Sequence, residues 1–220
     1  MATEADRQQA ALRDFVRAGG PAGRVYGLEW GDPRRDPVQA EVLRRFLLPF
    51  LSPPGTVLEI GAGGGRWTRE LAGRAARLVL VDGVPEFEAA IRHHLPDIEA
   101  AFLVAPDGRL PAVPDGSVDF AFSFDTFVHF HEALFDAYVE TAGRVLKPGG
   151  HLVLHHARHD PGCAYGPDCF RYRDEAAVAA VLGRNRLHEI AGHPIPCGLG
   201  SRVVLARRVD DWAGEVLLPG

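Results

Sequence analysis

From residue 56 onward the chain alternates short apolar segments with helical ones, and this alternation limits the available folds more than any other feature. The expected strands cover residues 56–60, 78–81, 99–104, 118–123, 151–155, 187–192 and 201–207. The expected helices cover residues 66–72, 86–95, 131–145 and 174–183. Strands separated by helices predict a parallel sheet with helices on both faces. We therefore expect an α/β fold with a doubly wound, seven-stranded, mostly parallel sheet.

The two ends of the chain depart from this alternation. The link between the last two strands contains Pro and Gly and is too short for a crossover helix, which predicts an antiparallel C-terminal edge strand. Residues 5–18 and 36–48 predict two leading helices, the second with Asp36 as N-cap and Pro37 in the first helical position. We expect residues 1–50 to form a helical extension, or lid, packed on the core formed by 51–220, within one domain overall.

Charge and cysteine content exclude several classes of function. The chain has 29 acidic and 24 basic residues, and the basic ones are scattered, so no stripe is available to follow a nucleic-acid backbone. No apolar run approaches the roughly 18 residues of a membrane span, and charges throughout residues 1–19 argue against a signal peptide. The three cysteines are an odd number, which favours reduced thiols in the cytoplasm. A homodimer is left open.

The turn after the first expected strand is rich in glycine, at Gly61, Gly63 and Gly65. Glycine permits positive φ and close approach of a ligand, and the following helix presents its positive dipole end. Such turns also join many strands and helices without binding anything. Arg66 stands where the dinucleotide fingerprint needs its third glycine, and Asp82 follows Gly61 by 21 positions, where a carboxylate can bind ribose hydroxyls. The pattern indicates a nucleoside site without a pyrophosphate.

Five segments in the same order resemble the motifs of the class I S-adenosylmethionine-dependent methyltransferases. They are residues 57–68 (Val-Leu-Glu-Ile-Gly-Ala-Gly-Gly-Gly-Arg-Trp-Thr), 80–83 (Leu-Val-Asp-Gly), 107–111 (Asp-Gly-Arg-Leu-Pro), 117–125 and 144–152. The resemblance implies a Rossmann-like fold and S-adenosyl-L-methionine as methyl donor, with S-adenosyl-L-homocysteine as product. It also implies that Asp82 holds the ribose and Asp107 the adenine amine. Gly108 departs from the pattern, because many relatives carry a side chain there.

The resemblance also implies which residues surround the cofactor. The expected cofactor-binding residues are Glu59, Gly61, Ala62, Gly63, Gly65, Trp67, Asp82, Gly83, Asp107, Gly108, Ser123, Phe124 and Val128. Trp67 is expected to pack under the methionine end. The leading extension, with Tyr26 and Trp30, is expected either to anchor the two helices or to close over the cofactor as a lid.

Histidines follow the fourth and fifth expected strands, at the carboxyl ends where ligands bind in open α/β sheets. The predicted catalytic residues are His129 and His156, as candidate general bases, with Asp125 as an orienting or metal-binding carboxylate. The predicted substrate-binding residues are Tyr26, Trp30, His129, His155 and His156. His131 is expected to cap the next helix, and His151 to be structural. A metal site built from residues 155–169, with His159, Asp160, Cys163 and Cys169, is weighed and set aside because the spacing matches no zinc pattern.

The function predicted from the sequence is methylation of a small-molecule acceptor by in-line displacement. The acceptor is expected to be a hydroxyl of a sugar or natural product, by analogy with bacterial tailoring enzymes of this family. Three alternatives stay open: a nitrogen acceptor, a non-catalytic cofactor-binding regulatory subunit, and a nicotinamide-dependent oxidoreductase. Arg66 and the lack of a Tyr-x-x-x-Lys pair disfavour the last.

Overall fold

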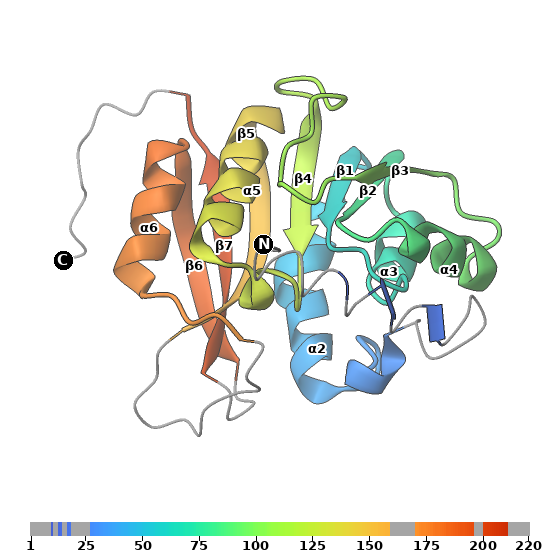
Figure 1. The fold of residues 1–220 in the computed structure, drawn as a ribbon. Coiled ribbons are helices and arrows are strands. Elements are labelled where there is room, and N and C mark those ends of the chain that lie inside the picture. Colours follow the sequence, from blue (N-terminus) through green and yellow to red (C-terminus); the bar gives the residue numbers. More distant parts are fainter. Residues whose placement is uncertain are drawn as a thin grey trace.

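The computed structural model describes residues 27–158, 170–195 and 200–210, together with Ala10, Arg13, Asp14, Arg17 and Ala18. Its centre is a seven-stranded sheet in the order β3-β2-β1-β4-β5-β7-β6 (Figure 1). The strands are β1 (Thr56–Ile60), β2 (Arg77–Asp82), β3 (Ala100–Val104), β4 (Val118–Ser123), β5 (Leu146–Ala157), β6 (Leu187–Ile195) and β7 (Ser201–Arg208). Every neighbouring pair is parallel except the two that involve β7. The expected doubly wound, mostly parallel sheet is confirmed.

The last strand, β7, runs antiparallel as predicted, but it lies one position inside the sheet and β6 forms the edge. Residues from Val203 to Ala206 of β7 are buried on both faces of the sheet. In contrast, β6 exposes much of its length and contains Pro194, which has no N–H to donate to a neighbouring strand. An apolar strand gains more from neighbours on both sides, so the more polar strand takes the edge.

Helices cover both faces of the sheet (Figure 1). They are α2 (Pro37–Val42), α3 (Thr68–Ala72), α4 (Glu86–His94), α5 (Glu132–Val145) and α6 (Glu175–Arg184). Successive strand side chains point to opposite faces, so Leu152 and Leu154 of β5 pack in one core with residues of α5 and α6. Val153 packs in the other core, with residues of α2, α3 and α4.

The second leading helix starts as predicted, because the Asp36 side chain accepts a hydrogen bond of 2.9 Å from the backbone N–H of Gln39, and Pro37 follows. It continues through η3 (Leu43–Leu47), a π-helical turn, and η4 (Leu48–Phe50). Phe46 and Leu47 are buried in the core on the α3 side. Most of the helix expected at 5–18 lies outside the described residues. No helix of the described part is long and apolar enough to cross a membrane.

Candidate functional site

The glycine-rich turn leaves the carboxyl end of β1 at the centre of the sheet. Gly61, Gly63 and Gly65 have φ of 77°, 51° and 91°, a region that favours glycine. The backbone N–H of Gly61 donates to the carbonyl of Val81 in β2 at 2.7 Å. A Cβ placed on Gly63 would meet no atom within 4 Å, so the outer side of the turn faces open space. The turn therefore has the form of an accessible backbone cradle.

Asp82, at the end of β2, lies directly beside this cradle. Its Oδ2 accepts a hydrogen bond of 3.0 Å from the N–H of Gly63, and its Oδ1 accepts one of 2.9 Å from Val84. Burial raises the pKa of Asp82 to about 6, although these N–H donors oppose the shift. The carboxylate is thus fixed at the turn, at the position expected for ribose binding.

Glu59, by contrast, is turned into the interior. It is only 2% exposed, and its Oε2 accepts a hydrogen bond of 2.7 Å from the Thr68 hydroxyl. Burial, together with the nearby Asp82, raises the pKa of Glu59 to about 8, although the hydrogen bond from Thr68 opposes the shift. Its observed contact joins β1 to the start of α3, so it supports the turn from behind, and direct contact with a cofactor stays a prediction.

The segment after β3 is held by helix α5. The Asp107 side chain accepts a hydrogen bond of 3.0 Å from the backbone N–H of Arg109 and is otherwise exposed. Gly108 has φ of 76°, and a Cβ there would lie 3.1 Å from the backbone nitrogen of Tyr138 in α5. Close packing on α5, together with the positive φ, therefore accounts for glycine at this position.

The segment after β4 closes against the glycine turn. The Ser123 hydroxyl is fully buried and donates to the carbonyl of Ile60 at 2.8 Å, so its observed role is to join β4 to β1. A Cβ on Gly61 would lie 2.6 Å from the Cβ of Thr126, which shows how closely the two segments approach. Between them, Asp125 has φ of 58°, which is uncommon for a residue with a side chain.

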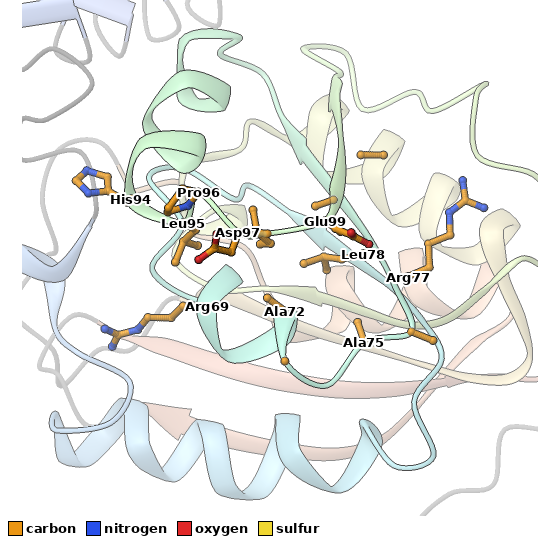
Figure 2. A pocket seen from close by; sticks show the side chains of 15 residues that line it. Arg69, Ala72, Ala75, Arg77, Leu78, His94, Leu95, Pro96, Asp97 and Glu99 are labelled. Atoms are coloured by element: carbon orange, nitrogen blue, oxygen red, sulfur yellow. The ribbon is translucent and has the colours of Figure 1, made fainter.

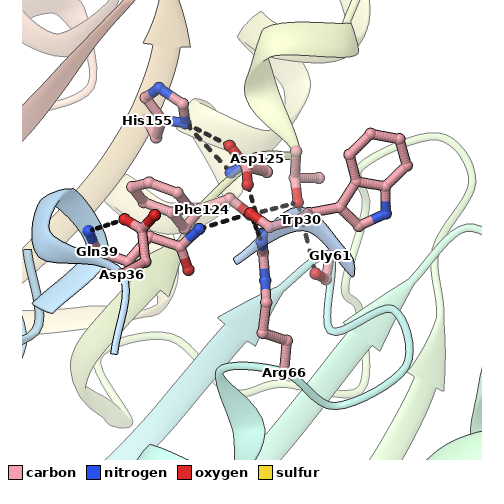
Figure 3. Close-up of polar contacts among 9 residues, drawn as sticks. Trp30, Asp36, Gln39, Gly61, Arg66, Phe124, Asp125 and His155 are labelled. Atoms are coloured by element: carbon pink, nitrogen blue, oxygen red, sulfur yellow. Dashed lines mark hydrogen bonds and ion pairs between the residues drawn. The ribbon is translucent and has the colours of Figure 1, made fainter. Parts of the chain in front are cut away.

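Arg66 joins three parts of the chain at this point (Figure 3). It is 7% exposed, and its Nη2 donates to Asp125 Oδ2 at 2.5 Å. Its Nη1 donates to the carbonyl of Trp30 at 3.0 Å. In the sequence, Arg66 only argues against a dinucleotide motif, and it is not among the predicted site residues. An arginine directly after a glycine turn was the available signal.

Asp125 also contacts His155, whose Nδ1 lies 3.0 Å from Oδ1 of the carboxylate. Burial would raise the pKa of Asp125, but the hydrogen bond with His155 and the charge of Arg66 outweigh it and lower the value to about 2. The His155 ring stacks on Phe124 with centroids 4.4 Å apart. Phe124 in turn packs against Trp67 at 4.9 Å. The sequence-predicted Phe124, Trp67, Asp125 and His155 therefore form one cluster.

The other two histidines lie elsewhere. His156 points to the α5 and α6 side, because adjacent strand residues alternate, and burial lowers its pKa to about 4. It is 1% exposed. His129 ends the 3₁₀ turn Phe127–His129 after β4 and is half-buried, with its ring 5.3 Å from that of Phe170. Val128 beside it is fully buried.

Trp30, in the segment before α2, has a largely exposed side chain, at 69%. Its carbonyl accepts from Arg66 and, at 2.7 Å, from Gln39 Nε2. Two ion pairs also join this segment to α3, Asp32 with Arg69 and Arg34 with Glu70. The backbone of the segment, rather than the Trp30 ring, thus makes the observed contacts. Tyr26 lies outside the described residues.

The cap at His131 and the metal site weighed for residues 155–169 remain to be placed. His131 caps α5, since its side chain accepts from the N–H of Leu134, as predicted. Among the described residues no three His, Cys, Asp or Glu side chains gather as they would around a metal ion. His159, Asp160, Cys163 and Cys169 lie outside the described ranges.

A hollow of about 820 Å³ lies between α3 and α4 (Figure 2). Its lining includes Arg77 and Leu78, which begin β2, and Glu99 and Ala100 at the start of β3. These are the amino ends of the strands, whereas Asp82 and the glycine turn lie at the carboxyl ends. The hollow is therefore separate from the nucleoside cradle.

The methyltransferase-domain family model matches residues 58–154, which contain the glycine turn, Asp82 and the β4 segment. Over this stretch the chain is similar to the class I S-adenosylmethionine-dependent methyltransferases. The expected family resemblance is thereby confirmed, and S-adenosylmethionine is the cofactor that the site has to accommodate.

The chain is similar to a ubiquinone biosynthesis O-methyltransferase from Xanthomonas axonopodis pv. citri, with 30% sequence identity. The match covers 69% of this chain and 59% of that relative. The chain thus spans about three fifths of that relative's length. A phosphoethanolamine N-methyltransferase from Haemonchus contortus shares the fold with a TM-score of 0.74 and 17% identity, over 98% of this chain and 51% of the other. A 1,6-didemethyltoxoflavin-N1-methyltransferase from Burkholderia thailandensis has a TM-score of 0.67 and 20% identity, over 96% and 92%.

The residues of the cradle fit S-adenosylmethionine. The open space at Gly63 admits a ligand to the main chain, and the fixed Asp82 carboxylate beside it can accept from ribose hydroxyls. The indole Nε1 of Trp67 is buried and has no hydrogen-bond partner among the described residues, which a bound polar group would satisfy.

Proposed function

We propose that this chain binds S-adenosyl-L-methionine and transfers its methyl group to a small-molecule acceptor, releasing S-adenosyl-L-homocysteine. The observation that carries the proposal is the hydrogen bond from Gly63 N–H to Asp82. It holds the Asp82 carboxylate, the expected partner of the ribose hydroxyls, beside an open glycine cradle. A sulfonium methyl group is already activated, so the protein chiefly has to align the acceptor and exclude water.

The acceptor atom in this proposal is the oxygen of a hydroxyl on a sugar or natural product. The curated relatives near 30% identity are named as O-methyltransferases, which supports oxygen. The structural neighbours named as N-methyltransferases are 20% identical or less and support the fold alone. A nitrogen acceptor is the alternative that the acceptor screen below distinguishes.

His129 is the general base in this proposal. Of the three candidate histidines it is the half-buried one, whereas His155 and His156 are 3% and 1% exposed. A half-buried ring can be approached from its exposed side, and a base must come within hydrogen-bond distance of the proton that it removes. Asp125 orients His155 through Nδ1, and the buried His155 lines the same end of the site.

The N-terminal extension, residues 1–50, acts as a lid on the methyltransferase domain in this proposal. Its support is the set of contacts from the segment before α2 to the loop and helix after β1, through Trp30, Asp32 and Arg34. The proposal also keeps the cytoplasmic location, the absence of nucleic-acid and membrane partners, and an open choice between monomer and homodimer.

Isothermal titration with S-adenosylmethionine, S-adenosylhomocysteine and NAD tests the cofactor assignment. We expect binding of the first two, and loss of about tenfold or more in affinity for Asp82→Asn, since hydrogen bonds to a charged group are worth about 1.5–3 kcal/mol. Asp115→Asn, an exposed carboxylate away from the cradle, is the control. Binding of NAD in place of S-adenosylmethionine and S-adenosylhomocysteine would overturn the assignment.

A panel of matched hydroxyl and amino acceptors, such as catechol with 2-aminophenol and glucose with glucosamine, tests the reaction. Release of S-adenosylhomocysteine and the mass of the product identify the methylated atom. Products that are methylated on nitrogen alone would refute the oxygen assignment. Tight cofactor binding without methylation of any member would favour the regulatory-subunit alternative.

A further inference from the structure

A single helical turn before α2 presents its apolar side chains to solvent. It is the 3₁₀ turn η2 (Leu28–Trp30), in which Leu28 is 38% and Trp30 is 69% exposed. Among the described residues, Val104 and Ile190 are the other large apolar side chains that are exposed. Isolated exposed apolar residues are common, so exposure alone assigns no role to them. The turn η2 differs in two respects, because its backbone is fixed and it adjoins the glycine cradle.

The backbone of η2 is held from two sides. The Trp30 carbonyl accepts hydrogen bonds from Gln39 Nε2 at 2.7 Å and from Arg66 Nη1 at 3.0 Å. Gly27 and Gly31 flank the turn with φ of 83° and 110°, and a Cβ on Gly31 would clash with the Gln39 side chain. The exposed indole ring is therefore carried on a fixed backbone. A side chain held in this way loses less conformational freedom when a ligand binds.

The turn lies at the end of the sheet where a methyl acceptor has to bind. A Cβ on Gly27 would lie 3.3 Å from the Cβ of Arg66, which directly follows the glycine cradle. Arg66 in turn pairs with Asp125, which follows β4 (Figure 3). In the function proposed above, on which the following assignment rests, the nucleoside lies at Asp82 on β2. Because β1 stands between β2 and β4, the methyl group and its acceptor belong on the β4 side.

A second aromatic ring lies beside the proposed base. The Phe170 ring is 5.3 Å from the His129 ring, at an interplanar angle of 75°. The two segments are joined, because the N–H of Arg171 donates to the carbonyl of Val128 at 2.7 Å. Both rings are half-buried, so each has an exposed part that a ligand can contact. An acceptor that approaches His129 therefore also approaches an aromatic side chain.

The charged side chains at this end of the sheet already bind one another. Arg66 donates to Asp125, which also contacts His155 Nδ1 at 3.0 Å. Recognition of a sugar needs several polar groups aimed at its hydroxyls, because a buried hydroxyl without a partner costs free energy. The exposed side chains of η2 are apolar instead, and they suit a flat carbon ring.

The acidity of the acceptor favours the same class of compound. An imidazole titrates near pH 6.5, and a phenolic hydroxyl, such as that of tyrosine, near pH 10. Transfer of the proton from a phenol to imidazole is thus unfavourable by only about 3.5 pKa units. An aliphatic hydroxyl is less acidic by several units, since water itself has a pKa of about 15.7. A histidine base is therefore better matched to a phenol than to a sugar.

We infer that the acceptor is a planar aromatic hydroxyl compound, a phenol or catechol, and that Trp30 and Phe170 select it by packing against its ring. His129 takes the hydroxyl proton, and the acceptor oxygen bonds to the methyl carbon while the carbon–sulfur bond breaks and leaves its electron pair on sulfur. The acceptor class is narrower than in the function proposed above, because it excludes sugars.

Binding of matched acceptors to protein loaded with S-adenosylhomocysteine tests this class. The pairs are phenol with cyclohexanol, catechol with cis-1,2-cyclohexanediol, and 1-naphthol with decahydro-1-naphthol, and glucose is added as a sugar. Isothermal titration gives the affinity for each compound, and turnover with S-adenosylmethionine identifies the products by mass. We expect an aromatic member to bind about tenfold or more tightly than its saturated partner and to be methylated on oxygen.

Trp30→Leu keeps the backbone contacts and the apolar character of η2 but removes the ring. We expect its affinity for the aromatic acceptor to fall about 3- to 10-fold, with the saturated partner and S-adenosylhomocysteine within about twofold. Phe170→Leu should act in the same way, and Trp30→Phe should restore most of the aromatic preference. Ile190→Ala removes another exposed apolar side chain, on the edge strand β6, and should change no affinity. Circular dichroism and urea unfolding check that each variant is folded.

Two results would overturn the assignment. One is loaded protein that binds a saturated member or glucose as tightly as the aromatic members, or that binds none of the aromatic members. The other is an unchanged aromatic preference in both Trp30→Leu and Phe170→Leu, which would show that neither ring contacts the acceptor. If the unmodified protein binds neither S-adenosylmethionine nor S-adenosylhomocysteine, the proposed function itself fails, so the two failures are distinguishable.

Discussion

Gly61 and Gly63 stand two positions apart in the same turn, yet alanine at the two positions should have very different effects. Both glycines have positive φ, at 77° and 51°, so each alanine costs about 1–2 kcal/mol for the left-handed backbone. A Cβ on Gly61 would also lie 2.6 Å from the Thr126 Cβ and closer still to its Oγ1 and Cγ2, whereas one on Gly63 would meet nothing within 4 Å.

Overpacking in a rigid site typically adds about 1–3 kcal/mol. We therefore expect Gly61→Ala to lower the free energy of unfolding by about 2–5 kcal/mol, and Gly63→Ala by about 1–2 kcal/mol. In a protein of this size each kcal/mol lowers the Tm by about 2–4 °C. Gly63→Ala should nevertheless bind S-adenosylhomocysteine much more weakly, because its new methyl group enters the cradle.

Urea unfolding and isothermal titration measure the two effects separately. Gly73→Ala is the control, since Gly73 has φ of −77° and a Cβ there meets nothing within 4 Å. Its stability should stay within about 1 kcal/mol of the unmodified protein, because replacing glycine at an ordinary φ is neutral or mildly stabilising. Equal destabilisation by Gly61→Ala and Gly63→Ala would refute the packing argument. Unchanged ligand affinity in Gly63→Ala would refute the cradle.

Three further predictions concern other parts of the site. The raised pKa of Glu59, about 8, means that the folded state holds a proton that the unfolded state releases near pH 4.5, so stability should fall as pH rises between these values. One such group changes the free energy of unfolding by at most about 1.4 kcal/mol per pH unit. Glu59→Gln should flatten this dependence in urea unfolding at pH 5, 7 and 9, and an unaltered slope would contradict the buried acid. Gly108→Ala should cost about 2–4 kcal/mol in the same assay, because its Cβ would lie 3.1 Å from the Tyr138 nitrogen at positive φ, and a loss below 0.5 kcal/mol would show that α5 yields easily. His129→Ala should lower methylation of a hydroxyl acceptor about 10²- to 10⁴-fold with cofactor affinity unchanged, whereas the cap variant His131→Ala should keep its turnover; retained turnover in His129→Ala would exclude it as the base.

Several elements could be predicted because their signals are local. The helix start at Asp36–Pro37 and the cap at His131 depend on hydrogen bonds within three residues of the capping side chain. The expected strands depend on short apolar runs, and all seven are present. Asp82 could be placed beside the turn because parallel neighbouring strands end at the same edge of a sheet.

The arrangement of charges around the turn could not be predicted in this way. Arg66 meets Trp30 across 36 residues and Asp125 across 59. No periodicity in the sequence links these positions. Ser123 and Glu59 were expected at the cofactor, but their observed partners are Ile60 and Thr68 in the interior. Membership of a motif therefore located these residues without showing which way their side chains point.

The sequence by itself determined the order of strands and helices along the chain, the glycine turn and the resemblance to the family, because each depends on residue types at short spacing. Only the tertiary structure decided that β6 rather than β7 forms the edge of the sheet, since this depends on which strand gains more from burial on both sides. It also decided that His155, and not the adjacent His156, lies with Asp125, because neighbouring strand residues face opposite sides. Partners distant in sequence meet only when the whole sheet is assembled, and the charged site at the turn is made of such partners.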